Sequence, residues 1–194
     1  MKDPIYLRNE CWQQAVHCFA TSYIFEQRVL RLRRRLRLLT FLGIATPATV
    51  GAAYATYGAK SLITIVLVAI ASLLGVIQVV FSAWSLAFKW DDDFAYSLGA
   101  QSANRALFDK YRTFASNPPS DIQQAQTRFD LIHQENESRT ASDERQGITD
   151  SEKRMGMRAA LRQLQKECAG CKKVPVSMTP SNCDVCGNFK VARF

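Results

Sequence analysis

Two long segments without a charged residue constrain the fold of this chain more than any other feature. They cover residues 38–57 and 61–88, and a short break at residues 57–60 separates them. A helix needs about 20 apolar residues to cross about 30 Å of hydrocarbon, and each segment has that length. A signal peptide followed by a buried helix fits less well, because a helix-like region precedes the first segment. Hydropathy therefore predicts a transmembrane hairpin.

Arginines before the first segment predict the orientation of this hairpin. The formal net charge of the chain is +8, with the excess at its two ends, while the connecting turn carries only Lys60. The arginines are Arg28, Arg31, Arg33, Arg34, Arg35 and Arg37. Because such flanks stay in the cytoplasm, both termini of a two-span chain are expected there. Contact with anionic lipid headgroups suits this position better than nucleic-acid binding does.

Small and polar residues divide the roles of the two segments. In the first, Gly43, Pro47 and Gly51 recur every fourth residue, a spacing that lets helix backbones approach closely in lipid. The second carries a weakly polar stripe within roughly 120° of a helix surface. Its members are Ser61, Thr64, Ser72, Gly75, Gln78, Ser82 and Ser85. Such a stripe lines a pore or joins packed helices, and the residue types alone do not distinguish the two roles.

The segments flanking the hairpin predict cytosolic helices. Residues 5–37 carry a heptad-like seam that indicates packing against another helix. The seam consists of Cys11, Ala15, Cys18, Ser22, Phe25, Val29, Leu32 and Leu36. Its two cysteines are expected as small buried residues rather than as redox or metal groups. Residues 91–93 are all aspartate, which favours the start of the next helix, with a ring of carboxylates at a pore mouth as the alternative.

Two more helices are predicted before a polar stretch. Residues 94–115 carry one apolar stripe and should form the first helix. The stripe consists of Phe94, Leu98, Phe108, Tyr111 and Ala115. Ser120, followed three positions later by Gln123, predicts a capping box at the start of the second helix. Residues 135–147 are polar without an apolar period and predict a loop or mobile linker.

The last predicted helix carries a basic stripe. Thr149 and Glu152 form a capping-box pair that opens this helix, which should run to about Glu167. Arg154, Arg158, Arg162 and Lys166 recur every fourth residue along one side. Such a stripe either binds the phosphates of a ligand or forms the solvated face of an amphipathic helix.

Four cysteines near the C-terminus form the most specific motif in the chain. Cys168 and Cys171 make one Cys-x-x-Cys pair, and Cys183 and Cys186 make another, with eleven residues between the pairs. Four thiolates at these spacings can surround one tetrahedral Zn²⁺. Two redox-active pairs are the weaker alternative, because a thioredoxin-like strand–helix setting is missing. With four sulfur ligands the zinc would have no open position and would be structural; Lys172 and Lys173 should lower the thiol pKa values.

These features together predict an all-α membrane protein with four parts. Residues 1–37 form an amphipathic helix, 38–88 the hairpin, 89–167 a cytosolic helical region and 168–194 a zinc-binding knuckle. Catalysis is not expected, since His17 and His133 lie on unrelated segments and neither a phosphate loop nor a nucleophile elbow occurs.

The order of these parts, with the four spaced cysteines, resembles the SLATT membrane proteins and, more narrowly, the mobilome CxxCx(11)CxxC proteins. That resemblance covers essentially the whole chain, although only the four cysteines match a spelled-out motif. It implies a membrane effector of a bacterial anti-phage system, in the inner membrane, encoded beside a nucleotidyltransferase. A nucleotide or short oligonucleotide would gate a homo-oligomeric channel whose opening depolarises the membrane and arrests the cell. The alternative is a non-conducting anchor or adaptor that recruits protein or nucleic acid through the zinc tail.

Overall fold

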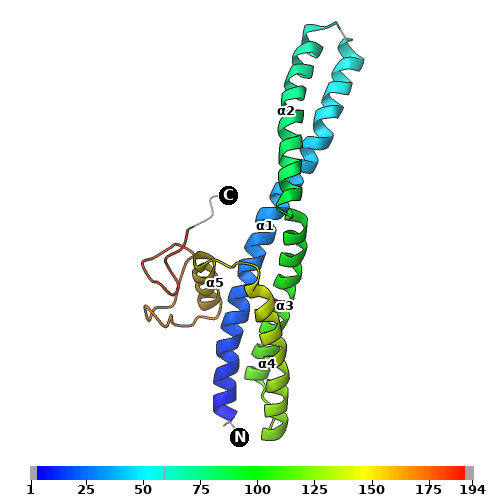
Figure 1. Cartoon of the computed structure of the whole chain (residues 1–194). Helices are drawn as coiled ribbons and strands as arrows, with labels where there is room; N and C mark the ends of the chain where they lie inside the picture. Colours follow the sequence, from blue (N-terminus) through cyan, green and yellow to red (C-terminus); the bar gives the residue numbers. More distant parts are fainter. Residues whose placement is uncertain (1–3, 59, 191–194) are drawn as a thin grey trace. The chain divides into compact units, whose positions relative to one another are not determined.

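The computed structural model describes residues 4–58 and 60–190, and within them every regular element is an α-helix. The helices are α1 (Pro4–Tyr57), α2 (Leu62–Ala87), α3 (Trp90–Ser116), α4 (Ile122–Glu144) and α5 (Asp150–Gln163) (Figure 1). The all-α prediction is therefore confirmed. Two compact units share these elements. We call residues 29–96 the hairpin unit, and the described residues up to 28 and from 97 onward the helical unit.

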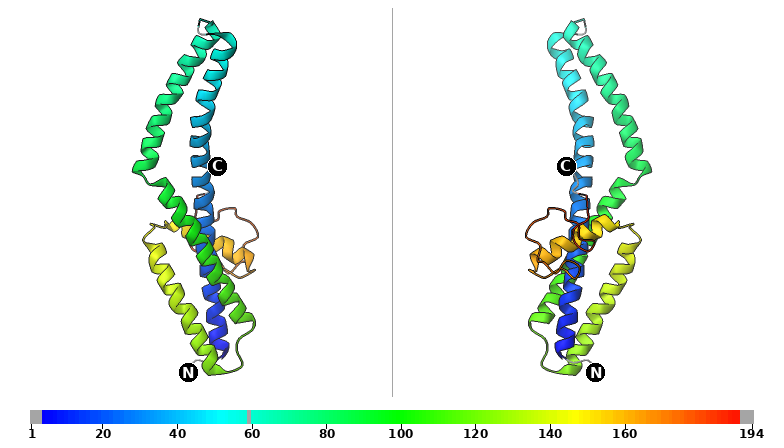
Figure 2. Two further views of the ribbon diagram at one scale, coloured as in Figure 1. Left: turned by 90° about the vertical axis from the view of Figure 1, so that its right-hand side faces the viewer. Right: turned by 90° about the vertical axis from the view of Figure 1, so that its left-hand side faces the viewer.

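The helical unit has an apolar core between the first part of α1, α3 and α4, which run beside one another in Figures 1 and 2. Its fully buried members include Leu7 and Cys11 from α1 and Tyr111 and Phe114 from α3. Phe129 of α4 meets Phe114 edge to face, with ring centroids 6.4 Å apart. The predicted seam of α1 is buried from Cys11 to Val29, while Leu98 of α3 is exposed and was wrongly assigned to the stripe.

Helix α4 is longer than the sequence pattern indicates. The prediction of a loop or linker over residues 135–147 is wrong as far as Glu144, where the helix ends. Buried polar contacts hold this part of the helix: Asn136 accepts from the Cys18 thiol at 3.3 Å, and Asp143 accepts from Asn104 at 2.7 Å. Such pairs satisfy buried polar groups without leaving an apolar period in the sequence.

The helix ends also differ in detail from the predicted ones. Asp121, rather than Ser120, caps α4, because its carboxylate accepts from the backbone N–H groups of Gln123 and Gln124. The Thr149 and Glu152 capping box at α5 is confirmed. Helix α5 ends at Gln163, earlier than expected, since Gln165 adopts a positive φ of 51° and closes the last turn.

The hairpin unit consists of the second part of α1 and the whole of α2, joined after Gly58, with the start of α3 (Figure 2). Gly58 has a φ of +74°, a conformation that glycine adopts without the steric cost of a Cβ atom. Helix α1 continues without interruption through Pro47, so the expected amphipathic helix and first span form one element. Both α1 and α2 are long and apolar enough to cross a membrane.

Candidate metal centre

The four cysteines of the C-terminal motif come together in the helical unit. Their Sγ atoms all lie within 4.8 Å of one another, and no other comparable group of potential ligands occurs among the described residues. Cys168 and Cys183 are separated by 3.8 Å and Cys171 and Cys186 by 3.9 Å, measured between Sγ atoms. A tetrahedral zinc with bonds of about 2.3 Å places its sulfurs about 3.8 Å apart. The donor set and spacing thus fit a tetrahedral thiolate-bound metal.

Each Cys-x-x-Cys pair lies on a tight turn. The backbone N–H of Lys172 donates to the Cys168 carbonyl at 2.9 Å, and the N–H of Gly187 donates to the Cys183 carbonyl at 2.8 Å. Gly187 has no room for a side chain, because a Cβ atom there would lie 2.6 Å from the Ser181 carbonyl oxygen. The turns and this close approach aim the thiols inward.

Backbone hydrogen bonds and burial shift the pKa values of two of these thiols in opposite directions. Backbone N–H groups of Cys186 and Val185 lower the pKa of the Cys183 thiol to about 6. Lys172 and Lys173 were expected to have this effect, but backbone donors are its main cause. Burial, followed by contacts with the other thiols, raises the pKa of Cys186. A bound cation would supply the charge that keeps all four sulfurs deprotonated.

Helix α5 holds the cysteine segment through two arginines. Arg158 is 9% exposed, and its guanidinium donates to the carbonyl oxygens of Ser177 at 2.7 Å and Cys186 at 3.3 Å. The Nη1 atom of Arg158, which donates to the Cys186 carbonyl, also lies 4.0 Å from the Cys186 sulfur, where its charge can offset that of a thiolate. Arg154 donates to the Asp184 carbonyl at 2.8 Å. These contacts fix the metal ligands against a helix that is itself packed in the unit.

Apolar contacts continue this attachment to α1. Cys168 and Cys186 share a buried cluster with Val16, Ala20 and Leu161. The whole arrangement, from the first part of α1 to the second cysteine pair, matches the family model described as "Mobilome CxxCx(11)CxxC protein" over residues 8–189. The chain belongs to the mobilome CxxCx(11)CxxC protein family. No curated protein and no solved structure matches it significantly.

The basic stripe predicted on α5 of this mobilome protein is divided. Arg154 and Arg158 point to the cysteine segment and donate to its carbonyls, whereas Arg162 is exposed. Lys166 lies beyond the end of α5, with Nζ 5.3 Å from the Trp12 ring centroid, and burial lowers its pKa. The four residues therefore do not form one common surface, and phosphate binding by them stays a prediction.

Two contacts of α5 were missed in the sequence. Gly156 allows close packing on α1, because a Cβ atom there would lie 2.6 Å from the Ala20 carbonyl oxygen. A glycine inside an otherwise helical pattern was the available signal. Arg28 forms an ion pair with Glu152 at 2.7 Å and also donates to the Gln146 carbonyl at 3.0 Å. Nothing in the local sequence links Arg28 to residues so far along the chain.

The predicted polar stripe of α2 is divided as well. Thr64 and Ser85 are buried within the described chain, whereas Ser72 and Ser82 are exposed. Ser61, Gly75 and Gln78 are half-buried. Gln78 packs on α1, since a Cβ atom at Gly43 would lie 2.7 Å from its Nε2 atom. One part of the stripe thus serves contacts within the protomer, and pore lining stays a prediction for the whole set.

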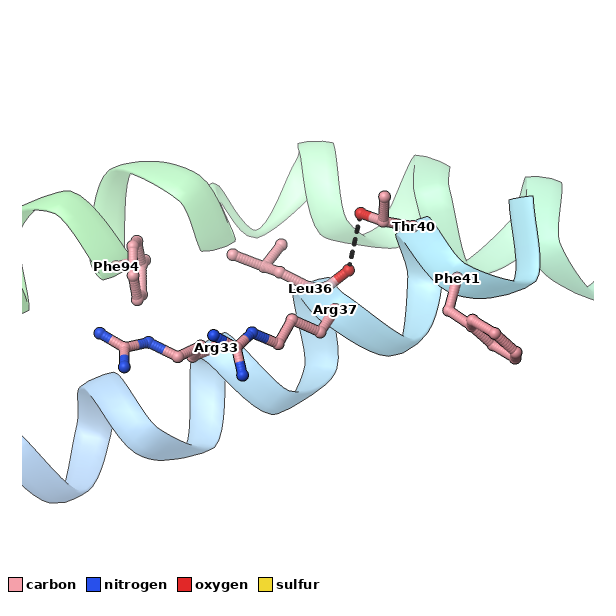
Figure 3. A pocket seen from close by; sticks show the side chains of 6 residues that line it. All are labelled: Arg33, Leu36, Arg37, Thr40, Phe41 and Phe94. Carbon is pink, nitrogen blue, oxygen red and sulfur yellow. Dashed lines mark hydrogen bonds between the residues drawn. The ribbon is translucent and has the colours of Figure 1, made fainter. Parts of the chain in front are cut away.

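The arginines before the first span line a hollow in the hairpin unit (Figure 3). It has a volume of about 400 Å³ and is lined by Arg33, Leu36, Arg37, Thr40, Phe41 and Phe94. The guanidinium of Arg33 lies 5.9 Å from the Phe94 ring centroid. Figure 3 shows the Arg33 and Arg37 side chains extending along the same side of α1. Two cations beside apolar groups suit an anion at a membrane surface.

Proposed function

We propose that this protein is a membrane-inserted, homo-oligomeric effector whose α2 helices line a pore. The observation that carries the proposal is the exposure of α2. In its most apolar stretch of 18 residues, only 6% of the residues are buried. Leu62 is 75% exposed and Val79 is 69% exposed. Apolar surface of this extent is unfavourable in water, whereas lipid and neighbouring copies would cover it. With both termini cytoplasmic, the helical unit would lie on the cytoplasmic side of a bacterial inner membrane.

The pore part of the proposal depends on the exposed members of the α2 stripe. Ser72 and Ser82 are exposed, and the Ser72 hydroxyl donates at 2.8 Å to the Val68 carbonyl of its own helix. A hydroxyl satisfied in this way can lie in an apolar surface and still accept a hydrogen bond from water. In an oligomer these positions would supply the weakly polar lining that ions need.

The metal in this proposal is a structural zinc ion held by Cys168, Cys171, Cys183 and Cys186. Four sulfur donors at tetrahedral spacing support zinc, and they leave no ligand position for a substrate. When bound, the ion would cross-link the two cysteine turns and compensate their negative charge. Arg158 would keep the loaded site attached to α5.

The signal in this proposal is a nucleotide or short oligonucleotide made by a nucleotidyltransferase encoded nearby, in a bacterial anti-phage defence system of the SLATT kind. Binding would open or close the pore only if the ligand has different affinities for the two assemblies. Arg162 is an exposed cation of the α5 stripe, so it can contact such an anion. Opening would depolarise the membrane and arrest growth of the infected cell.

Expression in cells that carry a membrane-potential dye tests the pore. The wild-type chain should depolarise the membrane under a triggering condition, and Ser72→Leu and Ser82→Leu should abolish that response. Ala69→Leu is the matched control, because it adds a similar side chain at an exposed position of α2 outside the stripe. An intact oligomer that depolarises under no condition would contradict the pore, as would equal loss of activity in Ala69→Leu.

Ligand binding needs a variant that leaves the cysteine segment attached. Arg162→Glu serves this purpose, whereas Arg158→Glu would also remove the bonds to the Ser177 and Cys186 carbonyls. Binding of a short oligonucleotide should be salt-dependent and weaker in Arg162→Glu. Unchanged affinity in this variant would remove α5 as the binding surface.

An anchor or adaptor without a pore is the second candidate, and one observation favours it. Thr64 and Ser85 are buried and Gln78 packs against Gly43, so part of the polar stripe already acts in packing. An adaptor should tolerate Ser72→Leu and still recruit its partner, whereas Cys183→Ser should disable either kind of protein by unfolding the tail.

A further inference from the structure

We propose that the cavity between α1 and α2 in the hairpin unit binds an acyl chain of an anionic phospholipid, with the lipid phosphate at Arg35. The cavity has a volume of about 530 Å³. Sites for small molecules have volumes of about 300–1,000 Å³, mostly apolar walls and a few polar groups that orient the ligand. The inference depends on the membrane insertion proposed above, but it does not depend on a pore.

One wall of the cavity is a single face of α1. Arg35, Leu38, Leu39, Leu42 and Thr46 line it. These positions fall within about 100° of one another around the helix, so they form one face along it. The charged residue stands at the end of that face, and the next residues along it are leucines. The wall therefore changes from cationic to apolar in the direction of the span.

The opposite wall is a single face of α2. Leu74, Ile77, Gln78, Phe81 and Trp84 line it, and these positions also share one side of the helix. Two apolar faces of this kind ordinarily pack directly against each other. Here Gln78 reaches α1 at Gly43, but beside this contact the two faces enclose a volume, which leaves the apolar side chains that line it incompletely packed. An elongated apolar group would restore those van der Waals contacts.

The polar end of the cavity is built for a headgroup. The Arg35 guanidinium lies 5.3 Å from the ring centroid of Trp90, which lines the cavity from the start of α3. Trp84 stacks on Phe88, with ring centroids 4.6 Å apart. Tryptophan and arginine at the end of an apolar span mark the headgroup level of a bilayer. A guanidinium there can bind two oxygens of one phosphate.

The lining chemistry favours a lipid chain over other occupants. Water needs two to four polar partners, and the described walls offer few polar side chains besides Arg35, Thr46 and Gln78. The hollow around Arg33 and Arg37 (Figure 3) provides the contrast. Its lining comes from α1 and from Phe94, without a wall from α2, so it can attract an anion but cannot enclose a chain.

Native mass spectrometry of the full-length chain in detergent tests the proposal, with phosphatidylglycerol and phosphatidylcholine of equal chain length as probes. The wild-type chain should retain one phosphatidylglycerol per protomer more tightly than phosphatidylcholine. Arg35→Gln should weaken phosphatidylglycerol about tenfold, because it removes a charge-assisted contact. Arg34→Gln is the matched control, since it removes the same charge from the neighbouring position of the same helix, and Arg34 lines neither this cavity nor the hollow of Arg33 and Arg37. Equal losses in both variants would overturn the proposal.

A second pair of variants tests the cavity itself. Leu74→Trp should displace both lipids by filling the space, whereas Leu73→Trp should leave binding unchanged, because Leu73 does not line the cavity and is 65% exposed. If Leu74→Trp binds the lipids as the wild type does, whether or not its oligomeric state changes, the lipid lies elsewhere and the proposal is overturned. Resistance of cell membranes to alkaline extraction, measured alongside, separates the two hypotheses. A chain that stays inserted but lacks the Arg35-dependent lipid refutes only this inference, whereas a chain that is extracted refutes both.

Discussion

The two units of this protein are both helical, yet many large apolar side chains are buried in the helical unit, whereas most are exposed in the hairpin unit. In the helical unit, Phe25 and Tyr111 are completely buried and Phe114 is 1% exposed. In the hairpin unit, Phe41 is 66% exposed and Leu73 is 65% exposed. The first unit has a core of its own, while the second shows its apolar surface to whatever surrounds it. Secondary structure alone therefore does not tell which solvent a helix needs.

The arginines of α1 show the same contrast along one helix. Arg28, in the helical unit, lies over the Phe25 ring and is also held by the Glu152 carboxylate and by the carbonyls of Gln146 and Gly147. Arg33 and Arg35, in the hairpin unit, lie over the aromatic rings of Phe94 and Trp90. The carboxylate and carbonyls use the donors of Arg28, whereas stacking on a ring leaves the donors of a guanidinium to a ligand or headgroup. One run of arginines thus serves two purposes.

The largest expected effect is on the candidate metal centre, whose four cysteines belong to the helical unit. Cys183→Ser should reduce bound zinc to near zero and expose residues 168–190 to amide exchange, because structural zinc contributes about 10–16 kcal/mol in small zinc-binding peptides. Zinc content by atomic absorption and hydrogen exchange by mass spectrometry measure this. Cys11→Ser is the control, since Cys11 is a buried cysteine outside the motif and should not affect zinc. A tail that stays protected without metal would show that the apolar contacts of α5 suffice.

A matched pair of phenylalanines gives the next largest effect. Phe114→Ala should lower the free energy of unfolding by about 3–5 kcal/mol, because it leaves a cavity in a packed core. Phe41→Ala should change it by less than about 0.5 kcal/mol in detergent, since Phe41 has few contacts to lose. Urea unfolding of both variants, followed by circular dichroism, provides the comparison. Equal losses would mean that the hairpin unit carries a core of its own.

The parts that could be predicted from the sequence are those with a strict period or spacing. Charge-free spans, the seam from Cys11 onward and the four cysteines each follow from one rule of geometry. The second half of α4 could not be predicted, because Asn136 and Asp143 are buried through hydrogen bonds to Cys18 and Asn104 on other helices. Polar burial of this kind depends on tertiary partners and has no local pattern.

The candidate site shows the same limit. Its ligands were readable from spacing, but the role of Arg158 was not, because a basic stripe is ordinarily solvent-exposed. Its guanidinium reaches carbonyl oxygens some 19 to 28 residues further on in the chain. Likewise, seven α2 residues share a stripe on the sequence, yet Thr64 is buried and Ser72 is exposed. Which part of a stripe is covered depends on the neighbouring helix.

The smallest expected effect is the pH dependence of the stability that the ion pair between Arg28 and Glu152 gives to the helical unit. Burial alone would raise the pKa of Glu152, but hydrogen bonds from Arg28 and from the Thr149 backbone outweigh it and lower the pKa from 4.5 to about 2. Because the folded pKa is depressed, the carboxylate contributes its full stabilisation above about pH 4.5 and loses it as the pH falls towards about 2. Glu152→Gln should therefore cost about 1–3 kcal/mol at neutral pH and progressively less in acid.

Urea titrations of the wild-type chain and Glu152→Gln between pH 7 and pH 3 measure this difference. Acid also protonates the metal-binding thiols, but that loss occurs in both proteins and cancels when they are compared. Glu135→Gln is the control, since Glu135 pairs with Lys110 at an exposed position and should contribute less than about 1 kcal/mol. The contradicting result is a difference in free energy of unfolding between wild type and Glu152→Gln that stays constant down to pH 3. This would mean that the stabilisation comes from the capping hydrogen bonds, which the amide retains only in part, and not from the charge pair with Arg28. Such a result would make the contrast between Arg28 and the arginines of the hairpin unit one of geometry instead of charge.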